Sequence, residues 1–432
     1  MSQHDAARRI RWSLLAVPVA GALVLAGCSG SSDNDADGGD TGNGDLAGFS
    51  VMVAQANDQD DFYAQILEQY SEETGVEVEV IPYPSDAYNT QVTTQLQAGN
   101  AADVMILAPG TGQPISVITL AEADFLEPLD ETSAGLIPEG SEAEYQIDGA
   151  TFAQPTALTP VGMVYNVTAA DEAGVTAYPE TYEELLEACT TARDGGKTFT
   201  VLAGGIPFNT GLFSMLISAT RVYAETPDWN EQRAAGEVTF ADSGWREVLE
   251  DVVEMNDAGC FQDGAAGGTF DNITAGLGGG TSLTAAVPGS AAASISDATG
   301  AELNVQAFPP ADGQEAFTVT GANYAWGINA SSDADVKESA QAFLDWVAQP
   351  ENAQAYAELS GSVPITGIDP ETLLPQYEPI GDLLSSGAYA GLPNATWPNP
   401  AVYDALGTGV QGLLTGQKTV DQVLDEMDAA WG

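Results

Sequence analysis

The apolar positions from residue 49 onward switch repeatedly between the spacing of strands and the spacing of helices. FSVMVA (49–54) and DVMIL (103–107) are short apolar runs that are typical of buried strands. FYAQILEQYSEETG (62–75) places apolar residues on one helical face and ends at a glycine, which predicts a helix. VEVEVI (76–81) alternates with a period of two, and the helix that follows it is expected to end near Gly99. This succession predicts an α/β fold with a doubly wound sheet.

The loops after the first and third predicted strands are the expected ligand region of this sheet. Ligands bind beyond the carboxyl ends of the strands in such folds, which here means residues 55–61 and 108–113. Asn57 and Asp58 in the first loop are the leading polar ligand contacts. The alternative for both is an acidic loop that is simply solvated.

A second α/β pattern occupies the rest of the chain. Helical spacing recurs in TYEELLEACTTAR, LFSMLISATRVYA, WREVLEDVVEMNDAG, VKESAQAFLDWVAQPENAQAYAELSG and VDQVLDEMDAAW. The glycine-rich GLGGG (276–280) lacks the lysine of a P-loop and does not connect a strand to a helix, so it predicts a loop and no nucleotide site. A chain of this length suits two lobes with separate cores.

The first 27 residues have the pattern of a secretory signal peptide. Three arginines at positions 8, 9 and 11 precede an apolar run at 14–26 that is too short to cross a bilayer as a mature helix. The run ends in Leu25-Ala26-Gly27-Cys28, which resembles the bacterial lipobox, whose cysteine is lipidated and becomes the mature N-terminus. Residues 28–46 are then the lipidated Cys28 and a flexible acidic linker. We expect a domain anchored to the extracellular face of the cell membrane; the alternative is a chance thiol after an ordinary signal.

The charge balance limits the possible partners. The sequence has 10 Lys and Arg against 63 Asp and Glu, a net charge of -53. Nucleic acid and anionic membrane surfaces are therefore poor partners, because phosphate binding needs clustered cations. Contact with the membrane is expected through the lipid anchor only. The acidic surface indicates solubility or adaptation to salt, or else docking against a basic surface.

Histidine chemistry is excluded from the mature chain, because the single histidine, His4, lies in the predicted signal. This removes Ser-His-Asp triads, Cys-His pairs and histidine zinc sites. We expect no catalytic residues, no metal and no cofactor. A glycosidase that uses two carboxylates remains the enzyme alternative.

Cys189 and Cys260 are the only thiols after Cys28, and an even pair outside the cell is expected to form a disulfide. The bridge would close a loop of about 70 residues and stabilise the fold by about 4 kcal/mol. The alternative is two buried, reduced thiols.

Several segments in order resemble the family 1 extracellular solute-binding proteins of ABC transporters, the maltose-binding-protein-like group. They are LQAGNAADVMIL, DGATFAQPTALTPVGMVYN, YPETYEELLEAC, TAAVPGSAAA, GANYAWGINASSDADVKESAQAFLDWVAQPENAQAYAELSGSVPI and GQKTVDQVLDEMDAAW. The resemblance implies a type II periplasmic-binding-protein-like fold of two α/β lobes. Lobe one would comprise residues 47–156 and 322–375, and lobe two residues 157–321 and 376–432. The crossovers would lie near 156–160 and 318–322.

The resemblance also implies a function. The lobes would close by hinge motion on a sugar, and the loaded protein, expected to be a monomer, would dock on the ABC permease. A sugar binder needs aromatic plates for ring faces and hydrogen-bonding groups for hydroxyls. The expected ligand contacts are Asn57, Asp58, Tyr88, Thr159, Phe208, Asn209, Tyr324 and Trp397.

The aromatic candidates each have a packing alternative. Tyr324 is expected to stack on ligand, or else to be a buried crossover aromatic. Trp397, in a proline-rich loop, is expected to be a stacking platform or a lid over lobe two. Phe208 and Asn209 match the lobe-two loop that faces ligand in the family, and Thr159 is an expected hydroxyl donor. Where the family commonly has Trp after Gly-Ser, this chain has Ala291, which favours a smaller ligand or compensation by Phe208 or Trp397.

Other functions remain open at this point. A polyol, an aminosugar or a cationic solute would suit a cleft rich in carboxylates. A secreted glycosidase and a non-transport adhesin are the alternatives outside transport.

Overall fold

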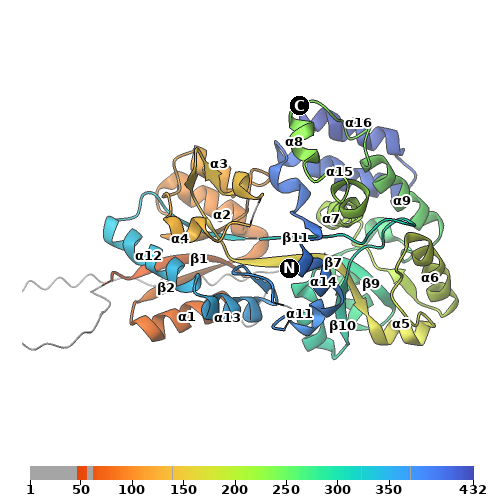
Figure 1. Ribbon diagram of the computed structural model, residues 1–432, viewed down its shortest axis with the longest axis horizontal. Helices are drawn as coiled ribbons and strands as arrows, with labels where there is room; N and C mark the ends of the chain where they lie inside the picture. The colour runs from red at the N-terminus through yellow and green to blue at the C-terminus, as the bar shows by residue number, and fades with distance from the viewer. Residues whose placement is uncertain (1–45, 56–61, 139, 323, 370) are drawn as a thin grey trace, which may run out of the picture. The chain divides into compact units, whose positions relative to one another are not determined.

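The computed structural model describes residues 46–55, 62–138, 140–322, 324–369 and 371–432. The predicted signal peptide, Cys28, nearly all of the linker, and the candidates Asn57 and Asp58 lie outside the described residues. The fold consists of two main sheets flanked by helices (Figure 1), which confirms the predicted α/β class.

The first sheet has the strand order β2-β1-β3-β12-β6. Its strands are β1 (Phe49–Gln55), β2 (Val78–Pro84), β3 (Val104–Leu107), β6 (Gln154–Pro155) and β12 (Ala325–Ile328). β1 pairs in parallel with both β2 and β3, whereas β12 is antiparallel to β3 and β6. The predicted strand at 76–81 begins two residues later and continues through Pro82 and Pro84, which an edge strand tolerates because its outer N–H groups need no partner.

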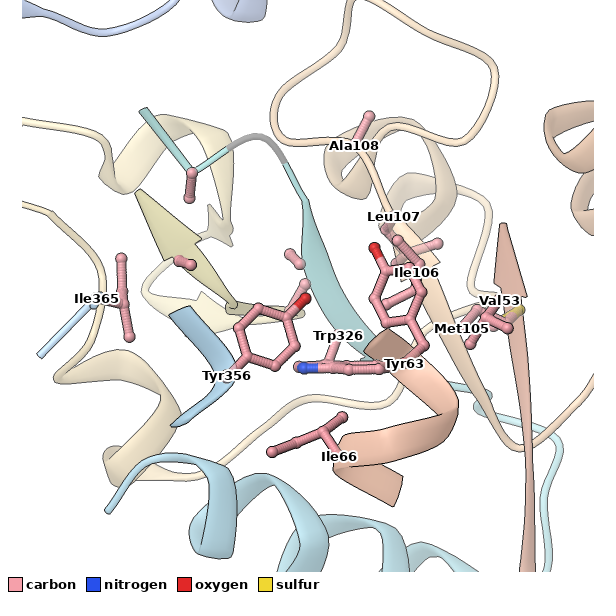
Figure 2. Close-up of a cluster of buried hydrophobic side chains, with 14 of the residues drawn as sticks. Val53, Tyr63, Ile66, Met105, Ile106, Leu107, Ala108, Trp326, Tyr356 and Ile365 are labelled. Atoms are coloured by element: carbon pink, nitrogen blue, oxygen red, sulfur yellow. The ribbon is translucent and has the colours of Figure 1, made fainter. Parts of the chain in front are cut away.

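Helices cover both faces of this sheet. They are α1 (Phe62–Thr74), α2 (Ser85–Ala98), α12 (Ala334–Val347) and α13 (Pro350–Ser360), with α2 on one side and α1 and α13 on the other (Figure 1). The helix predicted at 62–75 is α1, which buries Ile66, Leu67 and Tyr70 of the predicted apolar face together with Tyr63, whereas Phe62 is half-buried. Figure 2 shows the core beneath the sheet, where Trp326 lies between Tyr63 and Tyr356. The Trp326 ring meets Tyr63 edge to face, with centroids 5.7 Å apart.

The second sheet has the order β14-β11-β7-β9-β8, with β10 and β13 also paired to β7. Its strands are β7 (Ala157–Asn166), β8 (Thr198–Thr200), β9 (Ser282–Pro288), β10 (Leu303–Gln306), β11 (Thr318–Ala322), β13 (Val363–Pro364) and β14 (Tyr389–Ala390). All ten residues of β7 are buried. β7 and β11 pair antiparallel and occupy the two predicted crossovers. The lobe boundaries themselves stay a prediction.

Helices also cover both faces of the second sheet. They are α5 (Val167–Ala173), α6 (Tyr182–Asp194), α7 (Pro207–Ser218), α9 (Trp245–Asp257), α10 (Phe270–Gly278), α11 (Ser290–Thr299), α15 (Pro400–Leu414) and α16 (Val420–Trp431). Figure 1 shows α7, α15 and α16 on one side and α5 and α11 on the other. The Thr181 hydroxyl accepts the Glu184 N–H at 3.3 Å and so caps α6 where the sequence predicted a helix start.

The remaining elements are short. They are α3 (Val117–Glu122), α4 (Glu131–Ala134), α8 (Trp229–Ala234), α14 (Gly381–Ser386), β4 (Gln146–Ile147), β5 (Ala150–Thr151), a π-helical turn Ala219–Tyr223, and the 3₁₀ turns Glu142–Glu144, Ala265–Gly267, Pro375–Ile380 and Pro393–Thr396. Among the described residues, no helix combines the length and apolarity that crossing a membrane requires.

A disulfide joins Cys189 in α6 to Cys260, which follows α9. Both cysteines are fully buried. The Cys260 carbonyl accepts the Thr200 N–H at 2.9 Å, so the bridge connects a surface helix to the edge of the second sheet.

Candidate functional site

Four segments enclose a cavity between the carboxyl end of β3 in the first sheet and β11 in the second. They are the loop 108–113, the 3₁₀ turn Glu142–Glu144 with Ser141, the end of β11, and the segment 391–395. The loop 108–113 is one of the two loops that the sequence predicted to meet ligand. The cavity has a volume of about 40 Å³, which is close to the space one water molecule occupies in the liquid.

Two hydrogen bonds join the loop 108–113 to the segment 391–397 next to this cavity. The Thr111 N–H donates to the Ala395 carbonyl at 3.0 Å, and the Thr111 hydroxyl donates to the Trp397 carbonyl at 2.7 Å. Between them, Gly110 has a φ of +69°, and an added Cβ would lie 1.9 Å from the Ala395 carbonyl oxygen. The loop 108–113 and the segment 391–397 are therefore in direct contact, and this contact requires glycine at position 110.

Glu144 is the one ionisable residue that lines the cavity within the described chain. Its carboxylate forms no hydrogen bond or ion pair with the described residues, and burial raises its pKa to about 8. Asn394 also lines the cavity, and its buried side-chain oxygen Oδ1 has no hydrogen-bond partner among the described residues. The cavity lining therefore includes a half-buried carboxyl and an amide with a buried oxygen, and neither has a partner among the described residues.

No Lys or Arg among the described residues is paired with Glu144. Each Lys and Arg beyond the predicted signal is already paired elsewhere. The pairs are Lys197–Glu172, Arg221–Asp251, Arg233–Asp428, Arg246–Asp421, Lys337–Glu127, Lys418–Glu426, and Arg193 with the Ala258 carbonyl. Glu144 therefore has no positively charged partner among the described residues.

Two predicted ligand contacts are core residues in this structure. Tyr88 is buried, and its hydroxyl accepts the Ile106 N–H at 2.9 Å and donates to the Met52 carbonyl at 2.9 Å, so it braces β1 against β3. Asn209 is also buried. Its amide oxygen accepts the Ala203 N–H at 2.9 Å and its amide nitrogen donates to the Ala286 carbonyl at 2.8 Å. Neither side chain is accessible to a ligand, because the fold buries both and uses their polar atoms in internal hydrogen bonds.

Trp397 is the clearest departure from the sequence interpretation. Its side chain is 1 % exposed, and its ring packs against Phe240 and Trp245 with centroids 5.8 Å away in both cases. The structure therefore places the ring in the core of the second lobe and not on an open face. Of Trp397, only the backbone carbonyl takes part in the contact between the loop 108–113 and the segment 391–397, where it accepts the hydrogen bond from the Thr111 hydroxyl.

Two further candidates lie at the crossovers. Thr159 is buried in β7 with its hydroxyl 3.3 Å from that of Ser362. Tyr324 is 38 % exposed, and its carbonyl accepts the Thr156 N–H at 3.1 Å and the Thr156 hydroxyl at 3.0 Å. The Tyr324 ring is thus positioned by the crossover and keeps an accessible surface.

Phe208 belongs to an exposed aromatic group that we call the aromatic patch: Phe208, Phe270 and Tyr403. Phe208 is 51 % and Phe270 is 44 % exposed, and their ring centroids are 6.5 Å apart. The Tyr403 ring lies 6.2 Å from Phe208, and its hydroxyl donates to the Phe208 carbonyl at 2.7 Å. The patch adjoins the segment 391–397, because the Tyr403 and Trp397 rings are 6.3 Å apart.

The sequence interpretation missed four of these residues: Phe270, Tyr403, Glu144 and Asn394. Phe270 and Tyr403 each stand in the first turn of a helix, α10 and α15, and no local pattern links them to Phe208. Glu144 is one of 63 acidic residues, and Asn394 carries no motif. Among the described residues, no group of three or more His, Cys, Asp or Glu is arranged to hold a metal ion.

Solved structures with the same fold support the architecture. A chitin oligosaccharide binding protein superposes with a TM-score of 0.73 at 19 % identity, covering 89 % of this chain and 98 % of that one. A probable secreted solute-binding lipoprotein from Streptomyces coelicolor gives 0.69 at 20 %, covering 90 % and 99 %. RafE in complex with raffinose gives 0.69 at 17 %, covering 89 % and 98 %. The predicted two-lobed fold is confirmed.

Sequence comparison gives a second result. A search among curated protein sequences finds no match. The model of a family described as bacterial extracellular solute-binding protein matches residues 65–367, well over half of the chain. This protein therefore belongs to the bacterial extracellular solute-binding proteins.

Proposed function

We propose that this protein is the sugar receptor of an ABC importer. It is a lipoprotein held to the membrane by Cys28, captures a mono- or oligosaccharide between its lobes, and delivers it to a permease. The observation that carries the proposal is the exposed aromatic patch, whose Tyr403 ring contacts the Trp397 ring of the segment 391–397. Exposed aromatic faces bind the apolar faces of sugar rings, and nearby polar groups bind the hydroxyls.

The charge distribution supports a ligand without negative charge. Every basic residue beyond the signal is paired, so the cleft offers an anion no cation to bind. The structural relatives that bind chitin oligosaccharides and raffinose agree with a sugar.

A sugar can enter only after the contact between residues 108–113 and 391–397 opens, because about 40 Å³ does not hold a sugar ring. β7 and β11 pass between the lobes and are the expected hinge. A ligand that touches both lobes then favours the closed form in proportion to those contacts.

Titration calorimetry of the soluble domain against mono- and oligosaccharides tests the proposal. We expect heat with at least one sugar, compaction in solution scattering with that sugar, and no change in the sugar itself. Release of new reducing ends over time would instead indicate a glycosidase. A domain that binds no sugar of the panel would contradict the proposal.

The anchor is tested in cells. Incorporation of labelled palmitate is expected in the wild-type protein and should disappear in Cys28→Ser, which should be released from the membrane fraction. Labelling that persists in Cys28→Ser would place the lipid elsewhere.

Phe208→Ala is expected to weaken binding of the preferred sugar by about 1–2 kcal/mol, roughly five- to thirtyfold. The physical reason is the loss of the most exposed ring of the aromatic patch. Calorimetry measures the change, and Phe208→Tyr is the control that keeps the ring and should bind within about twofold. Equal affinities for all three proteins would remove the patch from the binding site.

The shut form without ligand is expected to lose stability as the pH rises. Its Glu144 has a pKa of about 8, whereas an open cleft returns the carboxyl to its ordinary value near 4.5. Between these values the shut form binds more protons than the open form, so its share falls as pH increases from 5 to 8. Scattering of the ligand-free protein should show expansion over this range, and Glu144→Gln should abolish the pH dependence. A radius that is constant with pH in the wild type would argue against this linkage.

A further inference from the structure

We propose that Asn230 is a positioning residue for closure of the cleft, because its side-chain amide holds the turn Pro393–Thr396 in the shape that receives the loop 108–113. Asn230 belongs to α8 (Trp229–Ala234) and does not line the cavity. This inference rests on the proposed function and adds a residue through which the affinity for a sugar is set. It is carried by the hydrogen bonds that join one short turn to α8 and to the loop 108–113.

Both N–H donors of the Asn230 amide are used by this turn. The nitrogen Nδ2 donates to the Pro393 carbonyl at 2.7 Å and to the Thr396 hydroxyl at 2.8 Å. The oxygen Oδ1 accepts the Tyr223 hydroxyl at 2.7 Å. An amide side chain has two N–H donors, and Asn230 gives one to each end of the turn. The turn is thereby bonded to α8 at its first and its last residue.

The orientation of the amide is fixed by its partners. The Pro393 carbonyl can only accept a hydrogen bond, so the amide nitrogen must face the turn. The oxygen is then left for Tyr223, which is buried at the end of the π-helical turn Ala219–Tyr223. Burial raises the pKa of Tyr223, so its hydroxyl keeps the proton that it donates. A reversed amide would place its oxygen against the Pro393 carbonyl oxygen, and that hydrogen bond would be lost.

Two carbonyls of the segment 391–397 are bonded to the first lobe. The Ala395 carbonyl accepts the Thr111 N–H at 3.0 Å, and the Trp397 carbonyl accepts the Thr111 hydroxyl at 2.7 Å. The Pro393 and Ala395 carbonyls, two residues apart, are thus bonded to different elements, α8 and the loop that contains Thr111. A change in the shape of the turn therefore moves the acceptors that Thr111 needs.

The fit between the turn and the loop tolerates little displacement. An added Cβ on Gly110 would lie 1.9 Å from the Ala395 carbonyl oxygen, and one on Gly112 would lie 2.8 Å from the Asn394 carbonyl oxygen. The two backbones are thus in direct contact. Hydrogen bonds are lost beyond about 3.5 Å, so a shift of the turn by about 1 Å would break the bond from Thr111 to Ala395. The shape of the turn decides whether the contact forms.

A residue that acts only through closure has a recognisable effect on affinity. The apparent dissociation constant rises as the share of the binding-competent form falls, and this factor is the same for every ligand of that form. A residue that touches the ligand instead changes the affinities for different sugars by different factors. Loss of the Asn230 amide is therefore expected to weaken the binding of all sugars alike.

Amide hydrogen exchange of the ligand-free protein tests the contact directly. In Asn230→Ala the Thr111 N–H should exchange roughly fivefold faster or more than in the wild type. The Gly110 N–H, which donates to the Glu144 carbonyl within the first lobe, should be unchanged. Gln232→Ala is the matched control and should behave as the wild type, because Gln232 lies in the same helix and its amide donates to the residue that precedes α8. Mass spectrometry with residue-level fragmentation measures both rates.

Calorimetry with raffinose, chitotriose and maltotriose gives the second readout. Asn230→Ala should weaken every sugar that the wild type binds by one common factor, about three- to tenfold. In a Gly110→Ala background, in which the added Cβ already prevents the contact, the same change should alter the affinity by less than about twofold. Asn230→Asp keeps the size of the side chain and the acceptor for Tyr223 but, when ionised, has no donor. It should match Asn230→Ala, and it decides the test if Asn230→Ala does not fold.

The outcomes separate this inference from the proposed function. Thr111 exchange that is equal in Asn230→Ala and the wild type, or losses of affinity that differ from sugar to sugar, would overturn the role of Asn230 and leave the sugar receptor intact. Fully additive effects of Asn230→Ala and Gly110→Ala would do the same. A wild-type protein that binds no sugar would overturn the proposed function, while the exchange of Thr111 would still decide whether Asn230 positions the turn.

Discussion

Gly110→Ala is expected to prevent the lobes from shutting and to weaken ligand binding by more than tenfold. The residue has a φ of +69°, and its added Cβ would lie 1.9 Å from the Ala395 carbonyl oxygen, a backbone atom that cannot move aside alone. Non-glycine residues in this left-handed region cost about 1–2 kcal/mol, and the steric overlap adds to that cost only in the shut form. The contact with Ala395 should therefore be lost while each lobe stays folded.

Gly75→Ala is the matched control for this experiment. Gly75 follows α1 with a φ of +77°, and an added Cβ there meets nothing within 4 Å. Both variants carry similar backbone strain, but only Gly110→Ala affects the contact between the lobes. We expect ligand-induced compaction in solution scattering for the wild type and Gly75→Ala, and none for Gly110→Ala. A Gly110→Ala variant that compacts fully and binds normally would show that this contact is not part of the liganded state.

Removing the disulfide is expected to lower the free energy of unfolding by about 4 kcal/mol, since the bridge closes a loop across a sequence separation of 71 residues. The double variant Cys189→Ala with Cys260→Ala should unfold at lower denaturant concentration. Reducing agent should shift the wild type in the same direction and leave the variant unchanged. Ligand affinity should stay within about twofold, because neither cysteine lines the cavity. Equal stability of the two proteins under oxidising conditions would contradict this expectation.

Local patterns determined much of the fold. The period of α1 and the apolar run of β3 specify a helix and a buried strand before any tertiary contact is considered. The Thr181 cap marks the start of α6 for the same reason, since capping involves residues three positions apart. The fold family followed from the order of such segments along the chain.

The site was predicted in part. The loop 108–113 does line the cavity, because strand order alone places it at a carboxyl end of the sheet. Phe208 is exposed, as a residue that stacks on a ligand must be. Three other predicted contacts are buried in the core: Tyr88, Asn209 and Trp397. An aromatic residue beside prolines is equally suited to a surface or a core, and only its distant neighbours decide between them.

What the sequence alone determined is the class of molecule: an α/β chain with a predicted secretion signal, no histidine after that predicted signal, and few cations. What only the tertiary structure decided is which acidic side chain of the described residues lines the cavity together with Asn394, and which glycine permits the two segments to touch. The reason is physical. Composition and periodicity depend on neighbours along the chain, whereas burial, pairing and steric contact depend on residues brought together from positions hundreds of residues apart.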